Sequence, residues 1–356
     1  MIYDIIIVGA GPVGCKVGEL VAKDGFKTLI LEEHPEIGKP VQCAGLVSHR
    51  IFELSGASDN VIVNVTKKAR FYSPNGKFIE LRSKKPVYVI DRERFDKELS
   101  SNATNAGVKI KRFTSFENYK KMKDSVKIKT SEGIINSKIL IGADGSNSTV
   151  ARVSKLKLPK NVLAAVQSTV KSEFETDTVE LWFDPKISPS FFGWVIPENK
   201  KWARVGLASH KNTLGYFKNF LRNRFNRDIK HKNSLAGVIR YGLIKNSVSE
   251  RVILVGDAAS QVKPFSGGGI IYGLISADIA AKACIKSLKE NNYSKKFFKE
   301  NYDNVWKKKL FLPIKKGLMM SKVIHSFSDK QLNFLFSTIR KSKFTKLMEF
   351  ADMDLL

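Results

Sequence analysis

Four residues near the start of the chain have the types and spacing of a nucleotide-binding turn. Gly9, Gly11 and Gly14 follow a short apolar run in the pattern G-x-G-x-x-G. Glycine at such a turn lets the backbone approach a pyrophosphate, and the N-terminus of the next helix offers free N–H groups to it. Glu32 ends the next apolar run and can accept hydrogen bonds from a ribose diol. These residues predict an adenine dinucleotide site; the simpler alternative is a tight strand–helix turn without a ligand.

Cys43, in the segment IGKPVQCAG, is a second candidate for chemistry. A thiol there could donate a proton, act as a redox partner or be only a small polarizable side chain. A buried, inert thiol is the alternative, because cysteine is among the residues most often buried. Cys15 and Cys284 are distant in the sequence. The three cysteines therefore predict neither a disulfide framework nor a metal site, and they favour a reducing, intracellular setting.

The elements that would position these residues can be predicted from the apolar pattern. Residues 2–8 and 28–31 have the pattern of buried strands, with an amphipathic helix between them. Another helix is expected to follow Asp91-Arg92. Strand patterns dominate the middle of the chain, and they include two hairpins and a set of single strands, at residues 71–81, 126–139, 164–170, 179–183, 193–196 and 203–208.

A later segment again combines a buried strand with a glycine-rich helix start. Arg251 to Val255 leads into Gly256-Asp257, and Gly267 to Gly269 precede a long apolar helix. Asp257 could hydrogen-bond a ribityl hydroxyl of a flavin, or it could simply cap a helix. A helix N-terminus at Gly269 could stabilise the negative charge of a reduced flavin. The sequence has no second G-x-G-x-x-G, so a separate NAD(P)H domain is not expected.

The charge balance is strongly basic, with 61 Lys and Arg against 34 Asp and Glu and a net charge of +27. Such an excess favours an anionic partner, either nucleic acid, an anionic membrane surface or a phosphorylated substrate; a basic but merely solvated surface is the alternative. The basic residues form no motif of a known nucleic-acid module, so nucleic acid is not expected. No apolar run approaches the ~20 residues of a membrane span, and the N-terminus lacks the basic stretch of a signal peptide.

Three separated segments are similar to those of a known group of enzymes. The glycine pattern, GADGSNSTVAR and RVILVGDAASQVKPFSGGG have the order and rough spacing found in the para-hydroxybenzoate hydroxylase-type FAD oxidoreductases. Within that group the chain most resembles the geranylgeranyl reductase family, which saturates isoprenoid double bonds in archaeal ether lipids and in plant and bacterial pigments. The segments that carry this resemblance are KPVQCAGLVS, Asp91-Arg92, FFGWVIPENKKWARVGLAS and VKPFSGGGIIYGL.

The resemblance implies roles for individual residues. Cys43 would lie near the flavin ring as the catalytic candidate, and Phe192, Trp194 and Pro197 would line a lipid channel. Relative to the family's Y-x-W-x-F-P pattern, this chain has Phe192 in the tyrosine position and Ile196 in the phenylalanine position, which removes the phenol. The residues that would bind FAD are Gly9, Gly11, Val13, Gly14, Glu32, Cys43, Ala44, Leu46, Arg92, Asp257, Gly269 and Ile270.

The expected fold is α/β, of the α+β kind, with three parts. A Rossmann-like FAD-binding domain is expected at residues 1–65, 86–160 and 245–290. A mainly antiparallel β-sheet domain for the substrate is expected to be inserted into it, at residues 66–85 and 161–244. A basic helical C-terminal region is expected at residues 291–356.

The function implied by the resemblance is FAD-dependent saturation of C=C bonds in the geranylgeranyl chains of isoprenoid lipid precursors, by hydride transfer from reduced FAD and protonation of the other carbon. The electron donor could be ferredoxin, reduced deazaflavin or NAD(P)H. The lipid is expected to carry a phosphate, and the protein to be cytoplasmic and peripherally bound to an anionic membrane. An FAD-dependent monooxygenase or halogenase of an aromatic substrate has the same fold and is the alternative.

Overall fold

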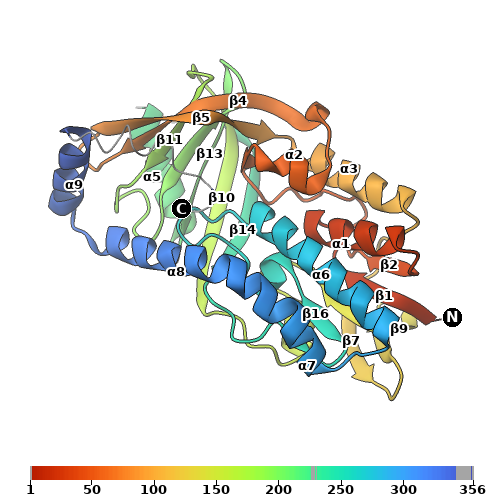
Figure 1. The fold of residues 1–356 in the computed structure, drawn as a ribbon. Coiled ribbons are helices and arrows are strands. Elements are labelled where there is room, and N and C mark those ends of the chain that lie inside the picture. Colours follow the sequence, from red (N-terminus) through yellow and green to blue (C-terminus); the bar gives the residue numbers. More distant parts are fainter. Residues whose placement is uncertain (1, 226–228, 230, 342–353, 355–356) are drawn as a thin grey trace.

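The computed structural model describes residues 2–225, 229, 231–341 and 354, which form two β-sheets and a set of helices (Figure 1). We call the first sheet sheet A. Its strands are β1 (Ile2–Val8), β2 (Thr28–Leu31), β6 (Lys109–Lys111), β7 (Phe116–Lys121), β8 (Val126–Thr130), β9 (Gly133–Gly142), β15 (Val248–Ser249) and β16 (Val252–Leu254). They are arranged in the order β15-β16-β9-β1-β2-β6, with β7 and β8 joined to β9 as an antiparallel extension.

The centre of sheet A is parallel and buried. Strand β1 pairs in parallel with both β2 and β9, and Ile5, Ile6 and Ile7 are fully buried. A continuous apolar run suits such a strand because helices and strands cover both of its faces. The helix α1 (Pro12–Lys23) packs against both α3 (Arg92–Asn105) and α6 (Ile270–Glu290) on one side of the sheet (Figure 1). The predicted Rossmann-like layer is therefore present.

The second sheet, sheet B, is mainly antiparallel, as predicted. Its strands are β3 (Leu46–Ser48), β4 (Ile62–Tyr72), β5 (Phe78–Ile90), β10 (Asn161–Lys171), β11 (Thr178–Trp182), β12 (Gly193–Pro197), β13 (Trp202–Ser209) and β14 (His231–Tyr241). Their order is β14-β10-β13-β12-β11-β4-β5-β3, and only the pair β4–β11 is parallel among these described strands. Strand β5 runs on to Ile90 and β3 joins the same sheet, so the predicted domain boundaries at residues 65 and 85 fall within strands of sheet B.

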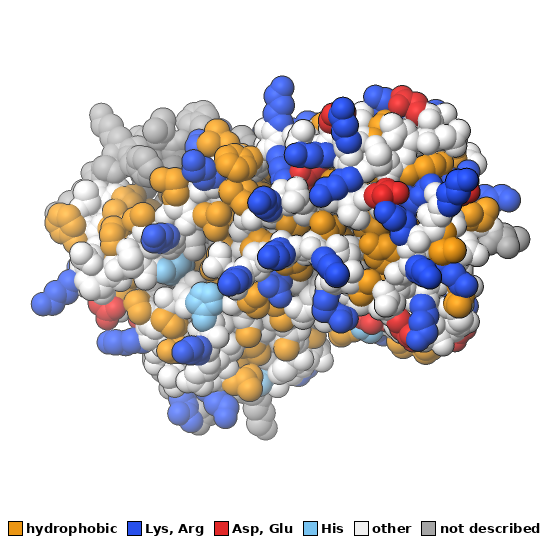
Figure 2. Space-filling view, turned by 90° about the horizontal axis from the view of Figure 1, so that it is seen from below, with side chains coloured by type: hydrophobic (Ala, Val, Ile, Leu, Met, Phe, Trp, Pro, Cys, Tyr) orange, Lys and Arg blue, Asp and Glu red, His pale blue; other side chains and the backbone are white. Residues whose placement is uncertain are grey.

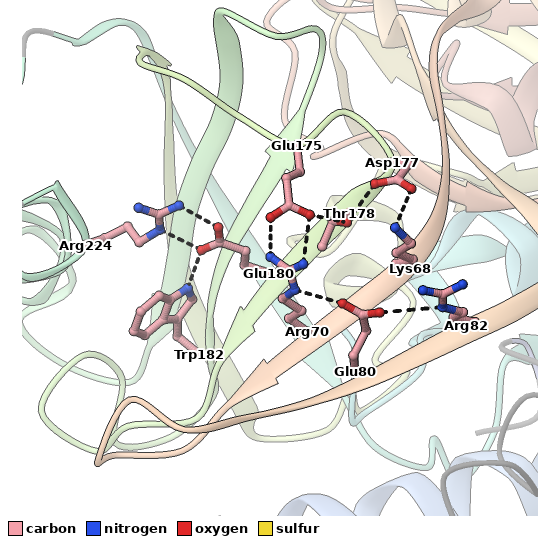
Figure 3. A network of polar contacts seen from close by, with 10 residues as sticks. All are labelled: Lys68, Arg70, Glu80, Arg82, Glu175, Asp177, Thr178, Glu180, Trp182 and Arg224. Atoms are coloured by element: carbon pink, nitrogen blue, oxygen red, sulfur yellow. Dashed lines mark hydrogen bonds and ion pairs between the residues drawn. The ribbon is translucent and has the colours of Figure 1, made fainter. Parts of the chain in front are cut away.

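The outer face of sheet B is polar along β4 and β11, whereas β10, β12 and β13 contribute Val166, Val195 and Leu207 to a separate apolar cluster. Side chains alternate along β4 and β11, and one set forms a network of ion pairs (Figure 3). The guanidinium of Arg70 donates to both carboxylate oxygens of Glu175, at 2.5 and 2.8 Å. Glu180 accepts hydrogen bonds from Arg224 and from the indole of Trp182. These bonds tie β4, β11 and the helix α5 (Thr213–Phe225) together.

The inner face of sheet B is apolar, and it carries a cluster of aliphatic and aromatic side chains. Phe71 and Leu181, which lie between the residues of the polar network, pack against this cluster. We call it the inner cluster, and its buried members are Ile79, Val89, Leu163, Val179, Phe183, Phe191, Phe192, Trp194, Ile196, Ala208, Tyr241, Val262, Leu332 and Phe336. Because the cluster includes residues from outside sheet B, it lies where that sheet meets the rest of the molecule.

The C-terminal region is mainly helical where it is described. Helix α8 (Asn304–Ser326) follows α7 (Lys295–Phe298) and the π-helical turn η3 (Lys299–Asp303), and it runs from the side of sheet A to α9 (Asp329–Lys341) beside sheet B (Figure 1). Most of the predicted region beyond residue 341 lies outside the described residues. The remaining elements are α2 (Arg50–Ser55), η1 (Asp59–Val61), α4 (Thr149–Val153) and η2 (Gly256–Ala259). Among the described residues, no helix combines the length and the apolar character needed to cross a membrane.

A buried hydrogen-bond chain connects this helical region to the turn after β16. The hydroxyl of Tyr302 is fully buried and donates to the carbonyl of Leu254 at 2.6 Å. The same hydroxyl accepts a bond from the side-chain amide of Gln261, whose carbonyl oxygen accepts the N–H of Gly256 at 2.7 Å. The hydroxyl of Tyr302 therefore fixes the Gly256–Asp257 turn from the side of the C-terminal region.

Replacing Tyr302→Phe should destabilise the protein by about 1–3 kcal/mol, because it leaves a buried carbonyl and a buried amide without their partner. Thermal unfolding of the FAD-loaded protein measures this loss. Tyr293→Phe is the matched control, since the Tyr293 hydroxyl bonds Asn291 at the surface, and it should leave the midpoint almost unchanged. Equal midpoints for the two variants would contradict the proposed anchoring.

Candidate functional site

The glycine turn between β1 and α1 has a backbone that only glycine fits. Gly9 has φ +103°, and a Cβ there would lie 2.5 Å from the carbonyl oxygen of Ala143. A Cβ on Gly14 would collide with the carbonyl of Gly9. Gly11 is the N-cap of α1, and the space beside it is open. The turn therefore combines tight packing inside with an open approach to the helix N-terminus, which suits a pyrophosphate.

Glu32 lies at the carboxyl end of β2, close to this turn. One of its carboxylate oxygens accepts the N–H of Ala10 at 2.8 Å, and the other accepts the N–H of His34 at 2.9 Å. Both bonds hold the carboxylate at the edge of the sheet beside the glycine turn.

A hollow of about 450 Å³ adjoins the end of β6 and is lined by Glu36, Ile37, Lys97, Ser100, Thr104, Ile110 and Arg112.

Val13 joins the glycine turn to the later glycine-rich segment. Its side chain packs against Gly256 and Gly273, and a Cβ on Gly273 would come within 2.5 Å of it. The missing side chains let α1 and α6 approach each other closely. Because the side chain of Val13 points into this contact, any bond from Val13 to FAD would come from its backbone.

Asp257 and Gly269 meet at the start of α6. Gly269 is the N-cap of α6, Ile270 is its first residue, and the carboxylate of Asp257 lies against the Cα of Gly269, where a Cβ would collide with it. The hydroxyl of Ser146 donates to Asp257 at 3.3 Å. Burial raises the pKa of Asp257, and Ser146 and the charge of Arg92 partly offset that rise. A buried acid beside a helix N-terminus is suited to hold hydroxyl groups and a partial negative charge.

Arg92 brings a positive charge to the same place. It is the first residue of α3, its guanidinium donates to both carboxylate oxygens of Asp96 at 3.0 Å, and its side chain lies against Gly45, two residues after Cys43. Burial alone would lower the pKa of Arg92, but Asp96 and Cys43 raise it above its usual range. Cys43 also accepts the N–H of Gly45 at 3.3 Å. The predicted residue Arg92 therefore lies beside the loop that carries Cys43.

Arg204, on β13, is a residue of this site that the sequence pattern did not predict. Its guanidinium donates to the carbonyls of Ala44 and Ile90 at 2.7 and 2.9 Å, and to Glu198 at 2.7 Å. It thus ties sheet B to the loop that carries Cys43. The sequence held one signal for this residue, namely an arginine in the middle of an apolar strand pattern. A buried charge needs partners, so such an arginine is expected to bind polar groups elsewhere in the fold.

The inner cluster adjoins the Cys43 loop. Ala44 and Leu46 pack against it, and so does Phe265 from the glycine-rich segment. Phe192 stacks on Phe191 with ring centroids 4.1 Å apart. The loop that carries Cys43 thus lies between Arg92 and the inner cluster.

Trp194 lies in the inner cluster, but Pro197 does not. The indole of Trp194 donates to Gln167 at 2.9 Å, and Gly206 on the next strand leaves room for the ring. Pro197 lies on the outer face of sheet B, where it borders a small hollow together with Arg70 and Glu180. Side chains alternate along β12, so Trp194 and Ile196 face inward and Pro197 faces outward. The structure therefore gives no support to Pro197 as a substrate contact.

A second buried ion pair lies beside the first turn of α6. The ammonium of Lys263 is 2.6 Å from a carboxylate oxygen of Asp354, and both side chains are almost fully buried. The hydroxyl of Ser48 donates to the other carboxylate oxygen at 2.5 Å, and the hydroxyl of Tyr272 donates to the backbone carbonyl of Asp354 at 2.9 Å. No sequence pattern indicated this cluster, because its members are up to 306 residues apart.

Comparison with known proteins agrees with this site. Residues 2–290 match the family described as "FAD binding domain". The digeranylgeranylglycerophospholipid reductase of Methanocaldococcus jannaschii is 30% identical over 96% of this chain and 91% of its own length. The enzyme of the same name from Methanococcus vannielii is 30% identical over 95% and 90%.

Solved structures give the same result for the fold. A geranylgeranyl bacteriochlorophyll reductase-like protein from Thermoplasma acidophilum is 27% identical, covers 99% of this chain and 96% of its own, and superimposes with a TM-score of 0.90. The FAD complex of the halogenase PltM, at 15% identity and a TM-score of 0.73 over 99% and 87% of the two chains, shares only the fold. The chain belongs to the geranylgeranyl reductase family, a family of FAD-dependent oxidoreductases, as its motifs predicted.

Proposed function

We propose that this protein saturates C=C bonds of geranylgeranyl chains in isoprenoid lipid precursors, with FAD as its cofactor. The observation that carries the proposal is the position of the Cys43 loop. Arg92 lies against the loop at Gly45, and the inner cluster packs against the loop through Ala44 and Leu46. A flavin on one side and an apolar chain on the other would both border this loop.

The residues of the glycine turns fit FAD. Gly9, Gly11 and Gly14 would admit the pyrophosphate to the N-terminus of α1, and Glu32 would accept from the ribose. At the other end of the cofactor, Asp257 would hold a ribityl hydroxyl, and Gly269 and Ile270 would present the N-terminus of α6 to the flavin ring. FAD, when bound and reduced, supplies the hydride for the alkene.

The inner cluster would hold the isoprenoid chain and exclude water. An isolated alkene is barely polarised, so its reduction depends on positioning and on a dry site. Phe192 and Trp194 would contact the chain. Cys43 is our candidate for the catalytic residue, because it carries an exchangeable proton on the loop between the FAD-binding turns and the inner cluster.

Three further parts of the proposal concern partners and location. The lipid substrate carries a phosphate, which suits the net charge of +27. The electron donor is external, either ferredoxin, reduced deazaflavin or NAD(P)H. The protein works in the cytoplasm and binds peripherally to an anionic membrane.

Addition of a geranylgeranyl glycerophospholipid to the anaerobic, dithionite-reduced enzyme should yield products heavier by two hydrogens for each double bond reduced, detected by mass spectrometry. The flavin absorbance should return to that of the oxidised form at the same time. An unchanged lipid mass would refute the reductase function. Rapid oxygen consumption with NAD(P)H and an aromatic substrate would instead support the monooxygenase or halogenase alternative.

Replacing Cys43→Ala should lower the rate of lipid reduction by a factor of roughly 10²–10⁴ if the thiol supplies a proton. FAD content should stay close to that of the wild type, because Ala44 and Leu46 remain to pack against the cluster. Cys284→Ala is a control for the loss of a thiol, since Cys284 is fully buried in the core formed around sheet A. A Cys43→Ala enzyme with the wild-type rate would show that Cys43 is structural.

A further inference from the structure

Helix α8 is the element that joins the two halves of the site on the side of the C-terminus. Its buried face consists of Trp306, Leu310, Ile314, Gly317 and Ser321. Gly317 lies against Pro264 of the glycine-rich segment, with 3.0 Å between a Cβ built there and the proline ring. Leu318 and Ile324 pack against the inner cluster. One side of α8 thus contacts both the glycine-rich segment and the proposed lipid site.

The opposite side of α8 carries an exposed row of apolar residues. Val305, Leu312, Met319 and Val323 are exposed by 37, 57, 62 and 49%. The first three are seven residues apart, and Val323 is one turn further on, so all four fall on one line along the helix. This apolar stripe is about 27 Å long at 1.5 Å per residue. The packing of the core does not explain it, because the core contacts the opposite side of the helix.

Lysines flank the apolar stripe on both sides. Lys308, Lys315 and Lys322 form one row at seven-residue spacing, and Lys309 and Lys316 form the other. All five are exposed, and among the described residues none of them has an acidic partner. The sequence contains no Asp or Glu from Asn304 to Ser328. The face of the molecule that is turned downward in Figure 1 carries Lys and Arg side chains between apolar ones (Figure 2).

We propose that the apolar stripe and its lysine rows bind the surface of an anionic lipid bilayer. The apolar side chains enter the boundary between head groups and acyl chains, while the lysines reach out to the lipid phosphates, as in interfacial amphipathic helices. Each lysine near an anionic surface adds attraction, and the effect weakens with salt. The proposal deepens the function proposed above by naming the surface through which the protein meets its membrane.

A second copy of the chain fits this face poorly. Two α8 helices packed along their stripes would set lysine rows against lysine rows, and the helix offers no acid to neutralise them. Nucleic acid would satisfy the lysines but leave the apolar stripe without a partner. A bilayer is the partner that offers both an anionic layer and an apolar one.

The position of α8 also determines how far the proposed lipid site lies from the membrane. The stripe faces the bilayer while the opposite side of the same helix covers the inner cluster, so the docked protein holds its lipid site within one helix diameter, ~10 Å, of the membrane. A geranylgeranyl lipid can then move from the bilayer into the site without crossing water. This consequence rests on the proposed function, whereas the docking itself does not.

Vesicle binding of the FAD-loaded protein tests the docking. The wild type should co-sediment with vesicles that contain phosphatidylglycerol and not with pure phosphatidylcholine, and the bound fraction should fall as salt is added. The double variant Leu312→Glu/Met319→Glu should bind at least ~10-fold more weakly. Leu214→Glu is the matched control: Leu214 lies on α5 and is exposed by 68%, and its replacement should not change binding. Retained flavin absorbance would show that each variant is folded.

Activity assays separate this proposal from the proposed function. The double variant should keep the wild-type kcat on lipid dispersed in detergent, and its KM should rise several-fold on lipid presented in anionic vesicles. If neither protein reduces lipid, the function fails while vesicle binding still decides the docking. Unchanged vesicle binding in the double variant would overturn the proposal. It would also be overturned if the wild type were a dimer, the double variant a monomer, and vesicle binding the same for both.

Discussion

The close approach of two strand–helix turns is the constraint on which the rest of this structure depends. The turn after β1 and the turn after β16 meet because glycine stands where a side chain would separate them, at Gly256 and at Gly273, which both lie against Val13. The two helix N-termini, those of α1 and α6, are thereby brought into one site, each with its unpaired N–H groups. An extended, negatively charged cofactor is what such a pair of helix ends can hold.

Arginine side chains then connect this cofactor edge to sheet B. Arg92, from α3, lies against Gly45 in the loop of Cys43, and Arg204 reaches the same loop from β13. Each also has its own carboxylate, Asp96 or Glu198, so that the buried charges remain paired. The loop is therefore fixed from both sides, which a hydride transfer between a flavin and an unpolarised alkene requires.

Because side chains alternate along its strands, sheet B has one face with a polar ion-pair network and another that forms the inner cluster. Arg70 and Glu180 point outward into an ion-pair network, while Phe71 and Leu181 point inward to the inner cluster. The same alternation explains why Trp194 belongs to the proposed lipid site and Pro197 does not. Helix α8 likewise has two different faces: one packs against the proposed lipid site, and the other is exposed.

The sequence by itself determined the elements and the cofactor class. Gly9, Gly11, Gly14 and Glu32 could be assigned because the chemistry of such a turn depends on residues close together in the chain. The hairpin of β4 and β5 in sheet B, the hairpin of β8 and β9 in sheet A and the helix after Gly269 were also predicted, since their patterns are local. The predicted boundaries at residues 65 and 85 cut through strands of sheet B, because strand length depends on partners that the local pattern does not show.

Only the tertiary structure decided which side chains meet. The clamp of Arg204 on the Ala44 carbonyl spans 160 residues, and the pair of Lys263 and Asp354 spans 91. A hydrogen bond or ion pair between such distant residues leaves no periodicity in the sequence. The position of Arg92 beside the Cys43 loop has the same origin: both residues could be named from their motifs, but their proximity follows from how α3 packs against this loop.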